Sequence, residues 1–209
     1  MRVIDFPQGS AEWLASRAGR VTASRIADVL ARIKNGEAAA RRDYRAQIVA
    51  EILTGKPQDS GFINDEMRWG VEQELFARAA YEVATDTLVD KVGLVLHPEI
   101  DRAAASPDGL AGDGLVEIKC PKTATHLEYL LAGEVPSKYR PQMLWQMACT
   151  ERAWCDFVSF DPRLPQDLQL FKVRLERDDK AIKDMETEVR KFLEEVDEVI
   201  EKLNQRKAA

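Results

Sequence analysis

Residues 115–120, Leu-Val-Glu-Ile-Lys-Cys, constrain the fold more strongly than any other part of this sequence. Apolar and charged side chains alternate along them and a proline follows, which is the pattern of a β-strand that ends there. Residues two apart on a strand point to the same face, so Glu117 and Lys119 are expected to lie side by side. Val116 and Ile118 then point the other way, into the core. The pattern predicts a strand that presents an acid and an amine together.

A second acid comes shortly before this strand, in the sequence Ser-Pro-Asp-Gly at 106–109. Taken alone, that tetrad is a typical structural β-turn, and a Glu/Lys pair on an exposed edge strand is common in any sheet. A Pro-Asp followed by Glu-x-Lys at a turn-to-strand junction indicates a catalytic site much more specifically than either piece does alone. Asp108, Glu117 and Lys119 are therefore the candidate catalytic residues.

These residue types suit metal-assisted hydrolysis of a phosphodiester. Asp108 and Glu117 offer the hard oxygen ligands that Mg²⁺ prefers, and the backbone carbonyl of Ile118 is a further candidate ligand. A bound cation lowers the pKa of its water and offsets charge on phosphate oxygens. Lys119 is suited to orient or deprotonate that water, because desolvation can lower the pKa of a lysine.

The rest of the chain predicts an α/β fold, a small mixed sheet flanked by helices. Helices are expected over 10–17, 22–34, 38–53, 65–83, 125–131, 138–150 and 178–207, and strands over 88–89, 92–96, 115–120, 154–160 and 168–175. We expect a single domain over 1–209, with a helical front (1–85), a sheet core (86–176) and a long C-terminal helix (177–207). The last helix carries an apolar stripe that we expect to pack on the protein's own body.

Charge and composition narrow the class of protein. The net charge is −6, and only residues 1–60, at +3, have a basic excess. A chain this acidic gains little DNA affinity from phosphate neutralisation alone, so another feature must hold a DNA substrate. No apolar run is long enough to span a membrane, and no signal peptide is evident. The cysteines, at 120, 149 and 155, form no paired motif, which favours a reducing cytoplasm.

Histidine offers few catalytic candidates, because His97 and His126 are the only two in the chain. Mechanisms built on a histidine base or on paired histidine ligands therefore find little support. We expect His126 at the surface or as a helix cap and assign neither histidine a catalytic role.

The motifs together resemble the lambda exonuclease family of recombination nucleases (phage-type alkaline exonuclease, YqaJ-like), whose core is of the PD-(D/E)xK restriction-endonuclease type. The resemblance runs from Trp13 to about Pro162. Its motifs are Trp13 with Arg17, Gly19 and Thr22-Ala23-Ser24; Trp69-Gly70 with Glu74; Ser106 to Leu110; Leu115 to Pro121; Tyr139 with Gln142; and Phe160 to Arg163. The long C-terminal helix matches no part of the pattern.

The resemblance implies a role for each matching residue near the metals. Asp108 and Glu117 match the metal carboxylates, and Lys119 matches the catalytic lysine. Glu74 matches an additional acid, and Gln142 matches the first glutamine of a helix motif that faces the site. A second glutamine at 146 completes a Q-x-x-x-Q spacing, which places both amides on one helix face.

The resemblance also implies that Arg17 and Ser24 grip the 5′-phosphate of the substrate strand. Read from the residues, Thr22 and Ser24 stand at a predicted helix start, where they either cap the helix or help its free amides to bind a phosphate. Arg17 would close on that phosphate with two donors. Trp13 either stacks on a base or packs in the core.

The expected function is a 5′-3′ exonuclease that digests one strand of linear double-stranded DNA to mononucleotides and leaves 3′ overhangs. The resemblance implies two Mg²⁺ ions per site, replaceable by Mn²⁺, a ring-shaped trimer threaded by DNA, and a single-strand annealing protein as partner. Two alternatives stay open. One is a PD-(D/E)xK endonuclease, of the junction-resolvase or restriction type, and the other is a non-catalytic DNA-end-binding protein.

Overall fold

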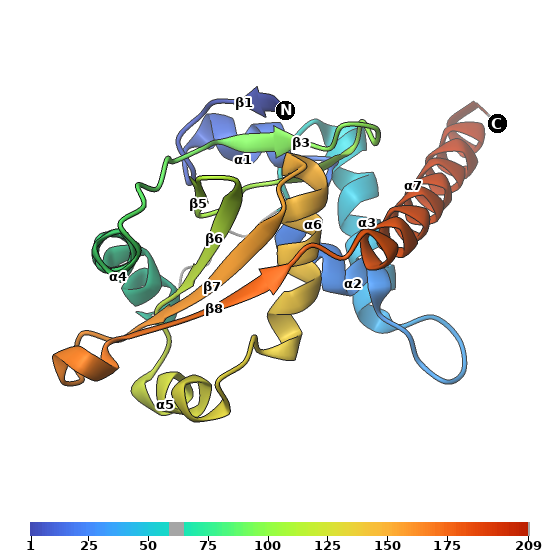
Figure 1. Ribbon diagram of the computed structural model, residues 1–209. Helices are drawn as coiled ribbons and strands as arrows, with labels where there is room; N and C mark the ends of the chain where they lie inside the picture. Colours follow the sequence, from blue (N-terminus) through green and yellow to red (C-terminus); the bar gives the residue numbers. More distant parts are fainter. Residues whose placement is uncertain (59–64, 209) are drawn as a thin grey trace.

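The computed structural model describes residues 1–58 and 65–208 and arranges them around two four-stranded sheets (Figure 1). The first sheet has the order β1 (Arg2–Ile4), β3 (Leu94–Leu96), β4 (Ala103–Ala105) and β2 (Val21–Thr22). The second has the order β5 (Gly109–Ala111), β6 (Gly114–Lys119), β7 (Trp154–Phe160) and β8 (Leu170–Glu176). Both mix parallel and antiparallel pairs. The α/β class is confirmed, but the strands form two sheets, whereas the sequence analysis expected one.

The helices follow the predicted pattern closely, with one exception. They are α1 (Ala11–Arg17), α2 (Ile26–Leu30), α3 (Ala39–Thr54), α4 (Asp65–Thr85), α5 (Thr123–Ala132), α6 (Arg140–Thr150) and α7 (Asp179–Ala208), with 3₁₀ turns η1 (Ala23–Arg25), η2 (Ser137–Tyr139) and η3 (Gln166–Leu168). The helix expected over 22–34 is wrong. Val21 and Thr22 pair in parallel with Ala103 and Ala104, so the backbone stays extended and α2 begins only at Ile26.

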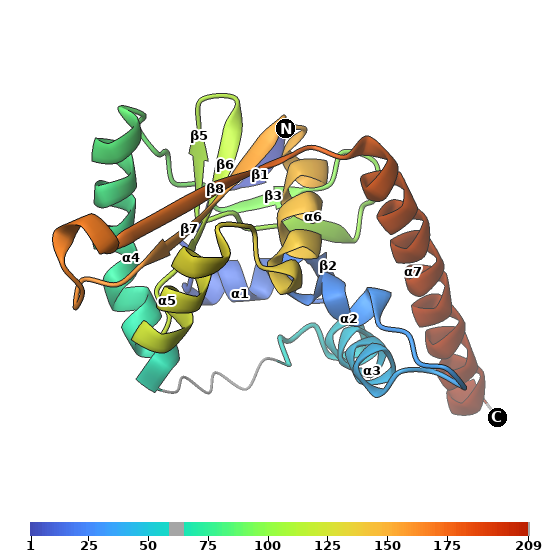
Figure 2. The ribbon, with the colours of Figure 1, turned by 60° about the horizontal axis from the view of Figure 1, so that its bottom comes forward.

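The second sheet lies between two helices, with α4 on one face and α6 on the other (Figure 2). Val116 and Ile118 point to the α4 face, where they form a buried cluster with Ala77 and Tyr81. Leu115, on the opposite face of β6, belongs to the main core with the apolar residues of α6. The predicted alternation along this strand is therefore confirmed, and it delivers the acid and the amine to the α6 side.

The segment 106–109 joins the two sheets. It leaves β4 of the first sheet, bends at Asp108 without a hydrogen-bonded turn, and enters β5 of the second. The chain thus bends at the tetrad, as the sequence predicted, but the pairing of both flanking strands leads it from one sheet to the other. Gly109 is required at the junction, since a Cβ atom on it would lie 2.1 Å from Cγ1 of Val89. The junction holds Asp108 between the sheets.

Helix α7 packs on the body of the protein, as expected. Its stripe from Ile182 to Val196 is buried in the main core, beside α2, α3 and α6. Arg41 of α3 forms ion pairs with Glu195 of α7 and with Glu37. Beyond Val196 the apolar stripe leaves the core, and Leu203 is 37% exposed. In the described part of the chain no helix is long and apolar enough to cross a membrane.

His126 is buried rather than at the surface, which corrects the expectation from the sequence. Its Nδ1 lies 2.7 Å from the Ser159 hydroxyl, and its Nε2 lies 2.9 Å from the carbonyl oxygen of Leu168. Both ring nitrogens thus have partners from elements distant in the sequence. These contacts offset the free-energy cost of burying a polar ring. The histidine ties α5 to β7 and to the turn before β8.

Candidate active site at the end of strand β6

Glu117 is the centre of the candidate site, and it is completely buried. Its Oε1 accepts a hydrogen bond of 2.6 Å from the side-chain amide of Gln142, and its Oε2 accepts one of 2.6 Å from that of Gln146. The Lys119 ammonium forms an ion pair with Oε1. Both amides come from the same face of α6, as the Q-x-x-x-Q spacing predicted. Together these donors hold the carboxylate in one orientation.

Asp108 reaches the same place from the junction between the sheets. Its Oδ2 accepts a hydrogen bond of 2.6 Å from the backbone amide of Ile118. Burial raises the pKa of Asp108 to about 8, and the charges of Glu117 and Glu74 add to that effect. The site therefore crowds carboxylates where water cannot separate them. Such crowding is relieved when one group takes a proton or when a cation binds between them.

Lys119 behaves differently from the sequence expectation. Burial acts to lower its pKa, but the charges of Glu117 and Asp108 outweigh burial and raise the pKa above its ordinary value. The amine is therefore an ammonium beside these carboxylates, and its expected lowered pKa is wrong for the metal-free protein. As a cation it is placed to orient a nucleophilic water or to stabilise charge on a phosphate.

Glu74 of α4 completes the acidic group. Its side chain is half-buried, whereas that of Glu72 on the same helix is exposed. The charge of Glu74 acts on two neighbours: it adds to the raised pKa of Asp108, and, after burial, it helps to raise the pKa of the Cys120 thiol to about 12. Of the two acids that the sequence offered on this helix, Glu74 is the one that lies toward the site.

The donor set fits a small hard cation. Among the described residues no group of three or more His, Cys, Asp and Glu side chains has the spacing of a complete metal site. Mg²⁺ needs no such cage, because it keeps several waters and binds through one or two carboxylates plus substrate phosphate. Asp108 and Glu117 are the residues that would hold it. A ligand role for the Ile118 carbonyl stays a prediction.

A second polar site lies at the start of the chain. Residues from α1 to α3 surround a cavity of about 110 Å³, and its lining includes Arg17, Arg20, Arg25, Thr22, Ser24 and Glu51. One terminal nitrogen of Arg17 donates to the Ser24 hydroxyl at 3.3 Å and to the Thr22 hydroxyl at 3.5 Å. Three guanidinium groups and two hydroxyls around one small cavity form a potential oxyanion site.

The helix-cap interpretation of Thr22 and Ser24 is wrong. Neither side chain makes a capping hydrogen bond, since Thr22 lies in β2 and Ser24 lies within the 3₁₀ turn that follows. The five-residue helix α2 then begins at Ile26, beyond both hydroxyls. Any phosphate chemistry in this cavity therefore rests on guanidinium and hydroxyl groups, not on free helix amides.

Trp13 connects the two sites and is neither a core residue nor an unengaged stacking platform. Its indole Nε1 donates to the Ser106 hydroxyl at 3.0 Å, and the Arg17 guanidinium lies 4.2 Å from the ring centroid. The next residue of the junction is also held, because the side-chain amide of Gln8 donates to the carbonyl oxygen of Pro107 at 2.9 Å. Sequence reasoning missed Gln8 because no local pattern links it to a segment about a hundred residues away.

Comparison with known proteins identifies the family. The model of the YqaJ-like viral recombinase domain matches residues 12–153. This stretch is more than half of the chain. It spans both the Arg17 cavity and the acid and lysine centre, which consists of Asp108, Glu117 and Lys119. The chain therefore belongs to the YqaJ-like viral recombinase family, as the motifs indicated.

Solved structures agree with this assignment. The chain is similar to the alkaline exonuclease LHK-Exo from Laribacter hongkongensis, with 49% identity, a TM-score of 0.87, and coverage of 95% of this chain and 98% of that one. A structure of LHK-Exo in complex with dAMP gives 48% identity, a TM-score of 0.88 and the same coverage. A phage-related exonuclease from Haemophilus somnus 129PT shares the fold at 16% identity, with a TM-score of 0.69 over 88% of this chain and 96% of that one. The search of curated proteins found no match.

Proposed function

We propose that this protein is a magnesium-dependent exonuclease that digests one strand of linear double-stranded DNA from its 5′ end. The observation that carries the proposal is the arrangement at the end of β6, where half-buried Asp108 and fully buried Glu117 converge and the Lys119 ammonium contacts Glu117. The similarity to an alkaline exonuclease over nearly the whole chain supports the reaction class.

The residues divide the chemistry among them. A divalent cation on Asp108 and Glu117 would supply a water of lowered pKa and neutralise charge on the scissile phosphate. Gln142 and Gln146 fix the Glu117 carboxylate through both of its oxygens, so that the ligand needs no rearrangement when the substrate arrives. Lys119 would stabilise the developing negative charge on the phosphoryl oxygens.

End recognition would belong to the Arg17 cavity. Its guanidinium and hydroxyl groups suit a terminal phosphate, and the Trp13–Ser106 hydrogen bond links it to the segment that carries Asp108. A 5′-phosphate bound there would set the first phosphodiester against the acids. The family resemblance supplies the strand polarity and the mononucleotide product.

Retention on DNA would come from assembly, since the net charge of −6 offers little attraction. The resemblance implies a ring-shaped trimer, and exposed apolar residues on α4 support an assembled state, because a soluble monomer rarely leaves a contiguous apolar patch uncovered. They are Val71 (71% exposed), Leu75 (59%) and Phe76 (57%). A monomeric mass in solution would remove the ring. The 3′ overhangs produced would pass to a single-strand annealing protein.

One digestion separates this function from the endonuclease alternative. Linear 5′-phosphorylated duplex and covalently closed circular duplex are incubated with Mg²⁺, and the products are resolved by size. An exonuclease releases mononucleotides from the linear DNA and leaves the circle intact. Cleavage of the circle would favour an endonuclease, and binding of linear DNA without turnover would favour an end-binding protein.

A further inference from the structure

The side chain of Gln8 bridges two segments that meet next to Asp108, and it has no role in the function proposed so far. Its amide nitrogen donates to the carbonyl oxygen of Val92 at 3.0 Å and to that of Pro107 at 2.9 Å. A side-chain amide carries two N–H donors, one for each of these acceptors. Val92 and Pro107 are buried, whereas Gln8 is exposed. Gln8 therefore acts through its hydrogen bonds and not through packing in the core.

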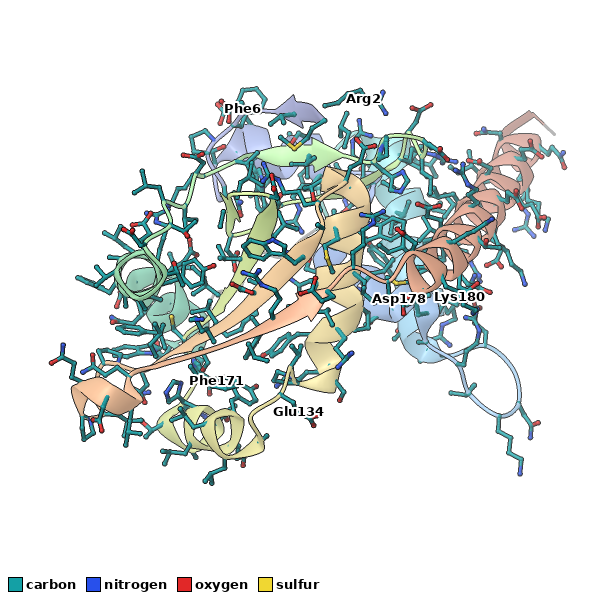
Figure 3. All side chains as sticks on the ribbon, in the orientation of Figure 1. Arg2, Phe6, Glu134, Phe171, Asp178 and Lys180 are labelled. Atoms are coloured by element: carbon teal, nitrogen blue, oxygen red, sulfur yellow. The ribbon has the colours of Figure 1, made fainter. Side chains whose placement is uncertain are left out.

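The segment before α1 lies close against the start of β3, which brings Gln8 to this place. Strand β1 pairs with β3, and the residues after β1 pass over Gly93. A Cβ atom on Gly93 would lie 2.3 Å from the carbonyl oxygen of Ile4 and 3.0 Å from that of Phe6, so only glycine allows this approach. Arg2 and Phe6, labelled in Figure 3, mark the course of the segment along the edge of the first sheet. The close approach puts the Gln8 side chain within reach of both carbonyl oxygens.

The bond to Pro107 fixes the main chain at Asp108. The carbonyl oxygen of Pro107 and the amide nitrogen of Asp108 belong to one planar peptide unit, so a bond to that oxygen sets the orientation of the unit that ends at the Asp108 Cα. Proline has no N–H, and its carbonyl is the main-chain group through which it can be held by a hydrogen bond. On the far side of Asp108, Leu110 exchanges two backbone hydrogen bonds of 2.9 Å with Asp90. The main chain is thus anchored both before and after Asp108.

Such anchoring matters because Asp108 has a reason to move away. The negative charge of Glu117 acts on Asp108 and opposes a second charged carboxylate there. Asp108 is only half-buried, so on a loosely held junction its side chain could turn towards solvent and escape the repulsion. The backbone amide of Ile118 holds the carboxylate itself, at 2.6 Å, and Gln8 holds the main chain from which it extends. The two contacts together keep the acids close before any cation binds.

We propose that Gln8 is a positioning residue, whose side-chain amide holds the peptide between Pro107 and Asp108 so that the Asp108 carboxylate stays next to Glu117, ready to take a divalent cation. The part that concerns the cation rests on the proposed function, whereas the part that concerns Asp108 applies to the protein without ligands. The alternative is a general role in stability, in which Gln8 does no more than tie the segment before α1 to the body of the protein.

Amide hydrogen exchange, followed residue by residue with NMR, tests the positioning in metal-free protein. The Ile118 amide donates to the Asp108 carboxylate, so its exchange rate reports how often that carboxylate leaves its place. Two variants are compared with the wild type. Gln8→Leu has a side chain of similar size and loses both donors, and Gln8→Glu keeps the shape of the side chain but has no N–H to donate at neutral pH.

Gln169→Leu is the matched control. The Gln169 amide also bridges two carbonyl oxygens, that of Pro162 at 3.2 Å and that of Leu164 at 2.8 Å, but it does so between β7 and β8. This turn lies far from the segment before α1, as the positions of Phe171 and Phe6 in Figure 3 show. The control therefore measures what the loss of such a bridge does to the stability of the whole protein.

We expect the Ile118 amide to exchange about fivefold to tenfold faster in both Gln8 variants than in the wild type, the effect of losing one ordinary hydrogen bond. The amides of β8 should exchange at the wild-type rate, and Gln169→Leu should leave Ile118 unchanged. Wild-type exchange at Ile118 in the Gln8 variants overturns the inference. An equal increase at amides throughout both sheets also overturns it, since that is the result of a general loss of stability.

Calorimetric titration with Mn²⁺ tests the consequence for the cation, apart from any cleavage. Gln8→Leu should weaken Mn²⁺ binding by about tenfold, as is typical when a group that orients a metal ligand is removed. Gln169→Leu should bind Mn²⁺ as the wild type does. Unchanged Mn²⁺ affinity in Gln8→Leu overturns the inference.

The same proteins separate failure of the inference from failure of the proposed function. Wild-type protein is assayed in parallel with Mg²⁺ on linear duplex. Cleavage by the wild type, with unchanged Ile118 exchange in the Gln8 variants, rejects the role of Gln8 and leaves the nuclease. Faster Ile118 exchange and weaker Mn²⁺ binding in Gln8→Leu, with no cleavage by the wild type, reject the nuclease and leave Gln8 as the residue that positions Asp108 for a cation.

Discussion

The acid and lysine centre and the Arg17 cavity are both charged sites on one chain, yet they are built in opposite ways. Glu117 is completely buried and both of its oxygens accept hydrogen bonds, so its position is fixed before any ligand arrives. Ser24 in the Arg17 cavity is exposed, and the donors of Arg17 reach the two hydroxyls at 3.3 and 3.5 Å. The first arrangement suits chemistry, which needs preorganised groups, and the second suits a ligand that enters and leaves.

The largest effect should come from Lys119. Lys119→Ala removes the cation that would offset charge on the scissile phosphate, so we expect at least a ~10²-fold loss of turnover with Mg²⁺. Lys172→Ala is the matched control, because Lys172 is an exposed lysine of the same sheet. The measurement is single-turnover digestion of linear duplex, with circular dichroism to verify folding. Near-normal turnover of Lys119→Ala would show that the chemistry lies elsewhere.

The Arg17 cavity should control the choice of end rather than the chemical step. Charge-assisted hydrogen bonds contribute about 1.5–3 kcal/mol each, so Arg17→Ala should reduce the preference for a 5′-phosphate by tenfold to a hundredfold. Arg17→Lys keeps the charge but loses the planar fork, and it should restore only part of the preference. Rates on 5′-phosphorylated and 5′-hydroxyl duplexes measure both variants. A loss that is equal on both duplexes would assign Arg17 to folding or to general DNA affinity.

Glu74 and Glu72 offer a matched pair on one helix. Glu74 acts on Asp108 and should help to hold the metal, so Glu74→Ala should lower activity by about tenfold and raise the Mg²⁺ concentration needed for half-maximal rate. The exposed Glu72→Ala should match the wild type. A magnesium titration of both variants checks this. Equal effects of the two substitutions would remove Glu74 from the site.

A separate effect, on stability rather than on rate, is a pH dependence in chelator. Burial raises the pKa of Asp108 to about 8, well above its value in an unfolded chain. Between about pH 4 and pH 8 the folded protein therefore holds a proton that the unfolded chain has lost, and stability falls as pH rises. Asp108→Asn should flatten this part of the curve, and Mg²⁺ should do the same for the wild type. Thermal melts at several pH values give the answer, and identical slopes for wild type and Asp108→Asn would contradict it.

Strand β6 could be predicted because its signal is local. The alternation around Ile118 predicts that Glu117 and Lys119 share a face of the strand, and the Q-x-x-x-Q spacing predicts that both glutamines share a face of α6. In the structure these two faces are in contact. The family motifs added Glu74 and Arg17, which no local period could connect to the strand. The pieces that lie far apart in the sequence were found only by resemblance.

What could not be predicted depends on pairing between distant segments. Val21 and Thr22 look like a helix start, but the parallel pairing with β4 makes them a strand. The Ala-Ala-Ala of β4 has no alternation, so neither that strand nor the division into two sheets had a local signal. His126 was misplaced for the same reason, since Ser159 and Leu168, its partners, come from other elements.

The most direct test of the central claim uses one linear duplex with a 5′-phosphate at one end and a 5′-hydroxyl at the other, each terminal nucleotide carrying a different label. Wild-type protein with Mg²⁺ is given this single substrate, and the initial release of the two labels is compared. The account predicts release from the phosphorylated end at least about tenfold faster, and release from both ends slowed by at least ~10²-fold in Lys119→Ala. Equal release from the two ends by the wild type would contradict it.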